Sequence, residues 1–504
     1  MRRLMAVALI VVPVLAGMDI RAHSTGVRDR QGPVSPASTR MSPLSLSSPD
    51  ASLRRSFDWA KEQALAYVFK GDPVGDWYEA ALPKREAFCM RDVSHQAMGA
   101  QALGLEALTL NMLRKFAANI SEAKDWCTYW EINRHDRPAP VDYRNDKEFW
   151  YNLPANFDLL DCCYRMYTWT GDKTYLDDPV FTNFYARTVT DYVKRWALGP
   201  DEVLTRERFL NRPSFDPEDP YQSCRGIPSY DEEEPGRTRL GIDLLALQAA
   251  AYRSYSKMMS MRGEALLAAE FQKMSEATSR LLEQTFWEDE KSCFNTLLLT
   301  DGRYSGRSGM EVYALYAESV SSVDKILKTL RSLLAGPPPN IEIRSHYPEV
   351  FFRYGAHREA YDLILELSSA QTPRREYPEV SFALIGALVN GFMGIQPEAS
   401  TGGVSTLSRL TEKTPWAEIS PVPVLRNSIR VRHTGREETR FTNLTGPPLI
   451  WIAKFYGEGT DLFVDGKRAP ASRSADLAGK PVQSTRLKVE AGRTLTVRLT
   501  PAAR

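Results

Sequence analysis

Apolar residues recur every three or four positions from Leu53 to about Gly394, in segments separated by turn-rich loops. This spacing places apolar side chains on one face of an α-helix, where they can be buried together. It therefore predicts an all-α region with helices over 53–69, 93–117, 149–170, 174–196, 239–260, 263–286, 309–318, 322–334, 348–354, 356–369 and 379–392.

The loops between these segments alternate in length. Short links, such as Thr170-Gly171-Asp172 and Met261-Arg262-Gly263, join consecutive helices into antiparallel hairpins, and longer loops separate the hairpins. This alternation predicts a closed ring of hairpins over residues 51–400. The string Tyr347-Pro348-Glu349-Val350 recurs thirty residues later as Tyr377-Pro378-Glu379-Val380, a period that suits one short helical hairpin, although four residues can also recur by chance.

After Gly394 the pattern changes to short alternating runs, for example at 428–432 and 495–499, separated by glycine and proline. Asp465-Gly466 is a hairpin-turn signal, and Ala491-Gly492 is a second one between two further alternating runs. The sequence therefore predicts a small antiparallel β-sandwich over residues 401–504.

The N-terminal residues have the pattern of an export signal. Two arginines precede an apolar run that is about long enough for a signal peptide but short for a membrane span, and Ala22 is a plausible cleavage point. A retained N-terminal anchor is the alternative. We expect a signal peptide over 1–22, a disordered Ser- and Pro-rich tether over 23–50, and a secreted or periplasmic protein with no membrane insertion after cleavage.

Composition excludes several functions. The net charge is +1 and the basic residues form no blocks, so nucleic acid is not an expected partner and a neutral ligand fits better. Six cysteines without CxxC or paired Cys/His spacing predict no metal and no cofactor, and leave one or two disulfides open. No GxSxG, P-loop, dinucleotide or HExxH motif is present. The sequence does not determine the oligomeric state.

A first loop combines aromatic and charged residues just before a long helix. Arg91 and Asp92 stand at the head of that helix, where a carboxylate can cap free N–H groups and an arginine offers a planar fork of donors. We predict that they clamp the hydroxyls of one sugar ring, with Trp77 or Tyr78 as a stacking wall; a simple cap with a surface ion pair is the alternative. His95, one turn later, is a candidate for the same clamp or a structural, hydrogen-bonded histidine.

A second loop segment, over 126–152, holds many Trp and Tyr residues beside many charges. Flat aromatic faces pack against sugar rings, and alternating carboxylates, amides and Arg suit a ring of hydroxyls. Packing of the loop over the helices for stability is the alternative. The predicted substrate-binding residues of this segment are Trp130, Glu131, Asp142, Arg144, Asp146 and Trp150.

A third segment is the acidic run after Tyr230. Clusters such as Asp231, Glu232 and Glu233 are usually solvated and favourable near a helix N-terminus. Like charges in a confined cleft also raise one another's pKa, and a glycosidase acid must keep its proton near neutral pH. Nothing in the sequence separates the three carboxyls. We favour Glu232 as the acid, with Tyr230 and Asp231 as substrate-binding residues.

The fourth segment is the repeated Tyr-Pro-Glu-Val. Proline fits the first helical turn and places the following glutamate where free N–H groups help to keep it ionised, as a general base requires. We predict Glu379 as the base, and Glu349, its counterpart, and Glu311 as substrate-binding residues. Capping of a helix start is the alternative for either repeat.

With these features the chain resembles the six-hairpin glycosidases, the (α/α)6 toroids that include glucoamylases and α-L-rhamnosidases. The resemblance covers residues 53–395 and is carried by Arg91-Asp92, which looks like the sugar-gripping pair of glucoamylase-like members. It implies that a mid-chain Glu, here Glu232 or a neighbour, is the acid and that Glu379 is the base. The tail from Gly403 and the β-domain look like the C-terminal β-sandwich of rhamnosidase-type members. No N-terminal β-domain and no rhamnosidase acid motif are found, so the resemblance leaves the sugar open.

The sequence therefore predicts an exo-acting glycoside hydrolase that inverts the anomeric carbon, with carboxyl groups roughly 6.5 to 9.5 Å apart. A polysaccharide lyase or unsaturated-uronide hydrolase on the same toroid is the first alternative, and would rely on Tyr143 and Arg144 instead. A glycan-binding protein without catalysis is the second.

Overall fold

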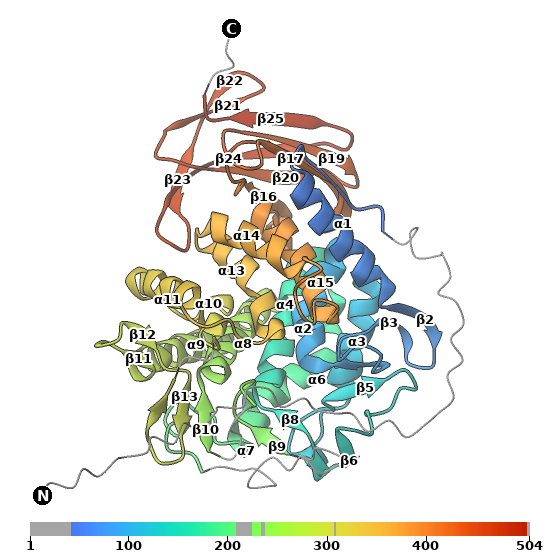
Figure 1. The fold of residues 1–504 in the computed structure, drawn as a ribbon, viewed down its shortest axis with the longest axis vertical. Coiled ribbons are helices and arrows are strands. Elements are labelled where there is room, and N and C mark those ends of the chain that lie inside the picture. The colour runs from blue at the N-terminus through green and yellow to red at the C-terminus, as the bar shows by residue number, and fades with distance from the viewer. Residues whose placement is uncertain (1–41, 208–223, 233–236, 307–308, 501–504) are drawn as a thin grey trace, which may run out of the picture. The chain divides into compact units, whose positions relative to one another are not determined.

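The structure is a computed structural model that describes residues 42–207, 224–232, 237–306 and 309–500 (Figure 1). The chain divides into Met1–Ala37 and Ser38–Arg504, and every described element belongs to the second unit. The predicted signal peptide at 1–22 and the predicted tether up to residue 41 lie outside the described residues. Among the described helices, none combines the length and the apolar character that crossing a bilayer requires.

Helices dominate the chain from residue 51 to residue 392, as the apolar spacing predicts. Two π-helical turns, at 188–192 and 387–392, extend α6 and α15. The α-helices are α1 (Ala51–Ala66), α2 (Met90–Ala102), α3 (Glu106–Ala118), α4 (Pro154–Thr170), α5 (Thr174–Asp177), α6 (Pro179–Arg187), α7 (Val193–Arg195), α8 (Ile242–Met261), α9 (Ala265–Thr285), α10 (Val312–Tyr316), α11 (Val323–Ala335), α12 (Ile341–Ser345), α13 (Tyr347–Arg353), α14 (His357–Leu367) and α15 (Pro378–Gly386).

Contacts between the described helices are of two kinds. Neighbours in sequence pack as pairs, such as α2 with α3, α8 with α9 and α13 with α14. A second series runs from α2 to α4, α8, α10, α13 and α15, and α15 packs in turn against α2. Nearly every residue of α2, α4 and α8 is buried, whereas α3, α9 and α14 are buried along one face. The first group therefore lies inside the helical region and the second outside it.

Three helix predictions need correction. The segment predicted as one helix over 93–117 is two helices, because Gly104 adopts φ +80°, a left-handed conformation that favours glycine and ends α2. The helix predicted over 149–170 begins only at Pro154, since the residues before it pair as short strands. The helix predicted over 174–196 is interrupted at Asp178, which ends α5 and caps α6 in an extended conformation. In addition, the short helix α12 was not predicted.

Short strands in the loops of the helical region help to position the candidate site. β4 pairs with β5 so that Cys89 lies opposite Glu131, and β8 runs parallel to β9 so that Asn152 lies opposite Ile227. These strands are β2 (Val68–Asp72), β3 (Gly75–Tyr78), β4 (Ala87–Cys89), β5 (Glu131–Asn133), β6 (Tyr143–Asn145), β7 (Glu148–Phe149), β8 (Tyr151–Asn152), β9 (Arg225–Ile227), β10 (Thr238–Gly241), β11 (Trp287–Glu288), β12 (Cys293–Phe294), β13 (Leu297–Leu299) and β14 (Tyr304–Ser305).

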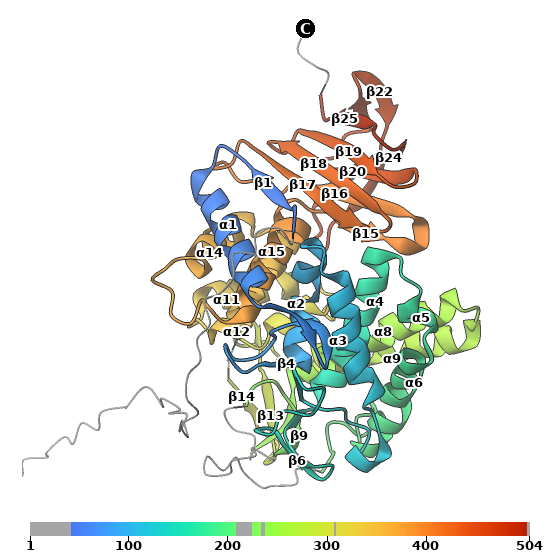
Figure 2. The ribbon, with the colours of Figure 1, turned by 90° about the vertical axis from the view of Figure 1, so that its right-hand side faces the viewer.

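The C-terminal region contains two sheets, as predicted. One has the order β1-β17-β18-β19-β25-β21-β22 and the other β15-β16-β20-β24-β23; Figure 2 shows β17, β18 and β19 side by side. Residues of β20 alternate between buried and partly exposed, and the ring of Trp451 stacks on Phe441 of the other sheet. The strands are β15 (Gln396–Glu398), β16 (Gly403–Leu407), β17 (Trp416–Val424), β18 (Asn427–Thr434), β19 (Glu438–Thr445), β20 (Leu449–Tyr456), β21 (Asp461–Val464), β22 (Lys467–Pro470), β23 (Ser472–Ala475), β24 (Pro481–Val489) and β25 (Thr494–Arg498).

Two details of the β prediction are wrong. β16 pairs with β20 in parallel, so the sandwich is not purely antiparallel. Asp465-Gly466 does close a hairpin, between β21 and β22, but Ala491-Gly492 does not: β24 pairs with β20 and β23, whereas β25 pairs with β19 and β21. The alternating pattern identifies strands without identifying their partners.

The predicted tether is also too long. β1 (Ser45–Ser47) pairs with β17, and Leu44 and Leu46 are buried. Leucine and serine alternate here, so that a strand can bury the leucines while its serines face outward, within a segment whose composition resembles a linker. All six cysteines are buried and none of them forms a disulfide, so the structure contains none of the bridges that the sequence left open.

Candidate functional site

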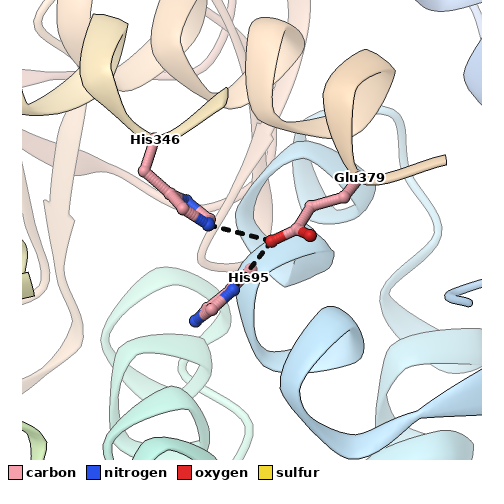
Figure 3. A group of neighbouring side chains, drawn as sticks. All are labelled: His95, His346 and Glu379. Carbon is pink, nitrogen blue, oxygen red and sulfur yellow. Dashed lines mark hydrogen bonds and ion pairs between the residues drawn. The ribbon is translucent and has the colours of Figure 1, made fainter. Parts of the chain in front are cut away.

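Glu379 lies at the centre of a buried polar cluster in the helical region. Proline at the first turn of α15 starts the helix, and Glu379 follows it with an exposed fraction of 0 %. Its Oε1 lies 2.7 Å from Nδ1 of His95 on α2 and 2.9 Å from Nε2 of His346, the residue before α13 (Figure 3). Its Oε2 accepts no hydrogen bond from the described residues. One oxygen is therefore held twice and the other is not held.

The two imidazoles determine the charge of this carboxyl. Burial by itself would raise the pKa of Glu379, but contacts with His346 and His95 lower it well below its usual range. Burial would lower the pKa of His95, but Asp158 and Glu379 raise it to about 9. The pKa of His346 is lowered by burial and by the neighbouring His95. Glu379 is therefore ionised at neutral pH, His95 is a cation and His346 is neutral.

Asp158 on α4 holds His95 from the other side. Its Oδ2 lies 2.7 Å from Nε2 of His95 and accepts a hydrogen bond of 3.1 Å from the hydroxyl of Tyr230. Arg165, on the same face of α4, bonds Asp161 at 3.0 Å and lies 4.0 Å from Asp158. The sequence analysis missed Asp158 and His346. For His95 the sequence left a sugar clamp and a structural, hydrogen-bonded histidine open. The structure favours the second, because both ring nitrogens lie 2.7 Å from a carboxylate and neither is left for a sugar.

Arg91 and Asp92 form the second part of the cluster. Nε of Arg91 donates to Asp92 Oδ1 at 3.0 Å, and the hydroxyl of Tyr377 donates to Asp92 Oδ2 at 2.7 Å. Arg91 also donates to Glu342 on α12, at 3.1 Å. Asp92 is 1 % exposed, and burial raises its pKa to about 7. Asp92 is therefore an internal partner of Arg91 and Tyr377, and only the partly exposed Arg91 can reach a ligand.

Glu232 is the third part. The side chains of Asn152 and Trp150 hydrogen-bond to it, and Trp150 Nε1 also donates to Asn152 Oδ1 at 2.8 Å. Burial raises the pKa of Glu232 to about 7, although Arg91 opposes that rise. Because Arg91 interacts electrostatically with both Glu232 and Glu379, it links the two predicted catalytic carboxyls.

The segment before Glu232 is fixed by Asp243 at the start of α8. Asp243 accepts hydrogen bonds from the backbone of Tyr230 at 2.6 Å and from the hydroxyl of Ser229 at 2.8 Å. Tyr230 is buried and its ring lies under Arg91, whose guanidinium carbon is 5.6 Å from the ring centre. Asp231 is buried beside Ser229, and Glu233 lies outside the described residues.

Glu131 and Asp142 form a separate acidic pair around Arg85. Arg85 lies 3.1 Å from Glu131 and 3.2 Å from Asp142. Burial, with the charge of Asp142, raises the pKa of Glu131 well above its usual range, and a hydrogen bond joins the two carboxyls. The charge of Asp92 also contributes to the raised pKa of Glu131, so the pair lies near the cluster around Glu379. Its own hydrogen bonds run between the two carboxyls and to Arg85. Trp130 is buried next to Tyr151.

Other predicted residues lie elsewhere. Trp77 and Tyr78 are fully buried: Trp77 stacks on Phe69 and Tyr78 packs against Phe382, so neither can form a stacking wall for a sugar. Four further residues have partners or positions outside the cluster around Glu379. Arg144 is exposed near Glu148, and Asp146 accepts a hydrogen bond from Tyr143 at 2.6 Å. Glu349 pairs with Arg353 at 2.5 Å, and Glu311 is buried at the start of α10.

The three side chains at the centre of the cluster, His95, His346 and Glu379, are also the candidate metal site among the described residues. The ligand atoms of His95, His346 and Glu379 lie within 4.8 Å of one another. The two imidazole nitrogens, however, lie at hydrogen-bond distance from a single carboxylate oxygen, and a metal would have to separate these atoms. The cluster fits proton sharing better, and the expectation that the protein needs no metal stays a prediction.

Comparisons with solved structures match this architecture. The α-L-rhamnosidase from Dictyoglumus thermophilum aligns over 91 % of this chain and 50 % of its own, with a TM-score of 0.60 and 10 % identity. The GH78 family rhamnosidase of Bacillus sp. GL1 aligns over 80 % and 40 %, with a TM-score of 0.53 and 12 % identity. A proposed kojibiose phosphorylase from the human microbiome aligns over 89 % and 68 %, with a TM-score of 0.50 and 9 % identity.

The chain shares its fold with the six-hairpin glycosidases. It spans about half the length of the first of these rhamnosidases and less of the second. No family model matches the sequence, and no curated protein matches it in a sequence comparison. The predicted resemblance is thus confirmed for the fold, while activity and substrate have to be argued from the site.

Proposed function

We propose that this protein is a glycoside hydrolase in which Glu232 is the general acid and Glu379 the general base. The proposal rests on two carboxyl groups near Arg91 whose pKa values are shifted in opposite directions. Burial raises the pKa of Glu232 to about 7, so that it can hold a proton near neutral pH, whereas His346 and His95 keep Glu379 ionised. A pair of carboxyls with separated pKa values is what acid and base catalysis at a glycosidic bond requires.

The architecture supports this assignment. The contact series α2, α4, α8, α10, α13, α15 and back to α2 fits the inner ring of an (α/α)6 toroid, with α3, α9 and α14 among the outer helices. In such a ring the segments before the inner helices meet at one end. Residues at the starts of α2, α13 and α15, namely Arg91, His346 and Glu379, contact one another or a shared neighbour, as this geometry requires.

The mechanism is a single displacement with inversion. Glu232 gives its proton to the glycosidic oxygen as the bond from that oxygen to the anomeric carbon breaks. A water attacks the same carbon from the opposite face, and its proton passes to Oε2 of Glu379. Because Glu379 is fully buried, this water must be enclosed together with the substrate.

The charges of the cluster favour a neutral sugar. Around the centre, the carboxyl groups of Asp158, Asp161, Glu342 and Glu379 are matched by the cations His95, Arg165, Arg91 and Arg374, each of which already pairs with one of them. A uronate would add a negative charge that none of these cations is left to balance. The lyase alternative also needs a tyrosine that loses its proton easily, but burial and Asp146 raise the pKa of Tyr143. We therefore propose a neutral oligo- or polysaccharide as substrate, cleaved from its end by a secreted or periplasmic protein.

The test uses two substrates for each variant, a neutral glycan and a matched glycoside with a nitrophenyl leaving group, with and without phosphate. We expect turnover that does not depend on phosphate. Glu232→Gln should lose about 10²- to 10⁴-fold on the glycan and much less on the nitrophenyl glycoside, which needs no acid. Glu379→Gln should lose similarly on both. Near wild-type rates in both variants would refute the assignment, and binding without turnover across a broad panel would favour a glycan-binding protein.

A further inference from the structure

We infer that Asp158, His95 and His346 are positioning residues that hold Oε1 of Glu379 so that Oε2 is directed at the reacting water. This role rests on the proposed function of Glu379. It gives a role to His95, for which the sequence left a sugar clamp and a structural histidine open, and to Asp158 and His346, which the sequence did not single out.

The geometry distinguishes the two oxygens of Glu379. Oε1 is 2.7 Å from one imidazole nitrogen and 2.9 Å from another, whereas Oε2 is buried and accepts no hydrogen bond from the described residues. A buried acceptor without a donor is costly, so it is rarely retained unless a ligand or a water uses it. A general base needs this arrangement, because only one oxygen receives the proton.

His95 cannot turn away from Glu379, because Asp158 holds its other nitrogen. The chain Asp158, His95, Glu379 crosses from α4 through α2 to α15, with separations of 2.7 Å at both steps. His346 enters from a fourth direction, between α12 and α13, and its ring centre lies 4.3 Å from that of His95. Residues of three other segments thus fix the carboxylate that α15 carries, which limits its rotation to a small range.

The same contacts set the protonation of the base. If a donor on Oε1 is removed, burial is opposed less strongly and the pKa of Glu379 rises. The acid limb of the pH dependence of kcat/KM then moves to higher pH. A residue that only fills space would not move that limb. The other charged or titratable groups that face Glu379 are Arg91, Asp92, Tyr313 and Tyr377, and all of them stay unchanged in the variants below.

The experiment compares His346→Leu, which removes the imidazole nitrogen 2.9 Å from Oε1, with His346→Gln, whose amide can donate to that oxygen. We expect kcat of His346→Leu to fall about 10²-fold with KM within about threefold, and its acid limb to move up by one pH unit or more. His346→Gln should recover most of the shift. His357→Gln, at another buried histidine that contacts Tyr456 instead, is the control and should change neither quantity.

Asp158→Asn provides the second variant, and it decides the matter if His346→Leu does not fold. It keeps the shape of the side chain but removes the charge behind His95, so we expect the same direction of shift. An unmoved acid limb in whichever variant folds overturns the positioning role. If Glu379→Gln itself stays active, the proposed function has failed; if Glu379→Gln is inactive while these limbs stay in place, only the positioning role has failed.

Discussion

The tetrapeptide Tyr-Pro-Glu-Val begins both α13 and α15, but the two copies have different surroundings. In α15, Glu379 is fully buried between His95 and His346, and Tyr377 donates to Asp92. In α13, Glu349 is partly exposed and pairs with Arg353 one turn later on its own helix. Local sequence thus sets the helix start in both places, while residues from distant segments set the chemistry.

This difference shows where reactivity comes from. Glu349 pairs with a residue of its own helix, and because both side chains are partly exposed, solvent weakens this interaction. The partners of Glu379 come from α2 and from the turn before α13, and they act inside the protein, where charge interactions are stronger. A proline in the first turn places both glutamates at a helix start. Only Glu379 also contacts groups that bind and release protons, namely His95 and His346.

The largest expected effect separates the two glutamates directly. Glu379→Gln should lower kcat about 10²- to 10⁴-fold, because the base is removed. Glu349→Gln is the matched change in the same motif and should stay within about threefold of the wild type. Steady-state rates on one substrate measure both, with unfolding temperatures as a control for folding. Equal losses in the two variants would show that the motif, and not its surroundings, carries activity.

A second comparison uses the tyrosines of the two copies. Tyr377→Phe removes the hydroxyl that donates to the buried Asp92, and leaving that carboxyl short of a donor should cost about 1–3 kcal/mol. Tyr347→Phe keeps the ring that packs on Phe351 and should cost less. Urea unfolding of both variants gives the two values. A larger loss of unfolding free energy in Tyr347→Phe than in Tyr377→Phe would show that the hydroxyl in α13 stabilises the protein more than the one before α15, against our expectation.

The pH dependence of stability gives a smaller, directional test. The pKa of His95 is raised from 6.5 to about 9, so its stabilising contribution is fully present below pH 6.5 and is lost as the pH rises through about 9. We expect the free energy of unfolding to fall over that window, and to fall less in His95→Gln. Urea unfolding at intervals from pH 6 to pH 10 measures this. Parallel curves would mean that His95 does not bind an extra proton in the folded protein.

The smallest effect concerns Arg353. Replacing it with Met removes the ion pair with Glu349 and also the contacts with Glu318 and with the backbone oxygen of Tyr316. Because the side chains of Arg353 and Glu349 are partly exposed, the share of the loss that comes from this pair should be within about 1 kcal/mol. Activity should not change. A fall in kcat as large as that of Glu379→Gln would place the α13 copy in the reaction.

The helical fold could be predicted because its signal is local. Apolar spacing predicted the region, and Gly171 and Gly263 end helices in left-handed conformations at the short links. Partners in the sheets could not be predicted in the same way: the alternation that identifies β24 and β25 says nothing about the strands beside them. Leu44 and Leu46 were missed because three residues of strand are a weak signal inside a Ser-rich segment.

The candidate site was predictable only in part. Glu379, Glu232 and Arg91 stand beside helix starts or in an acidic run, where sequence rules apply. His95 and Glu379 are 284 residues apart, so no spacing rule connects them. Two weaker signals were present: His346 directly precedes the first Tyr-Pro-Glu-Val, and Asp158 and Asp161 are acidic residues in a helix that is otherwise almost wholly buried and apolar.

The stereochemistry of the product tests the acid and base pair most directly. Proton NMR during the first minutes of cleavage of a glycan of known anomeric configuration shows which anomer the enzyme releases before mutarotation. Water activated by Glu379 on the face opposite Glu232 should release the inverted anomer first. Release of the retained anomer would mean that a carboxylate forms a covalent intermediate, and would contradict the role proposed for Glu379.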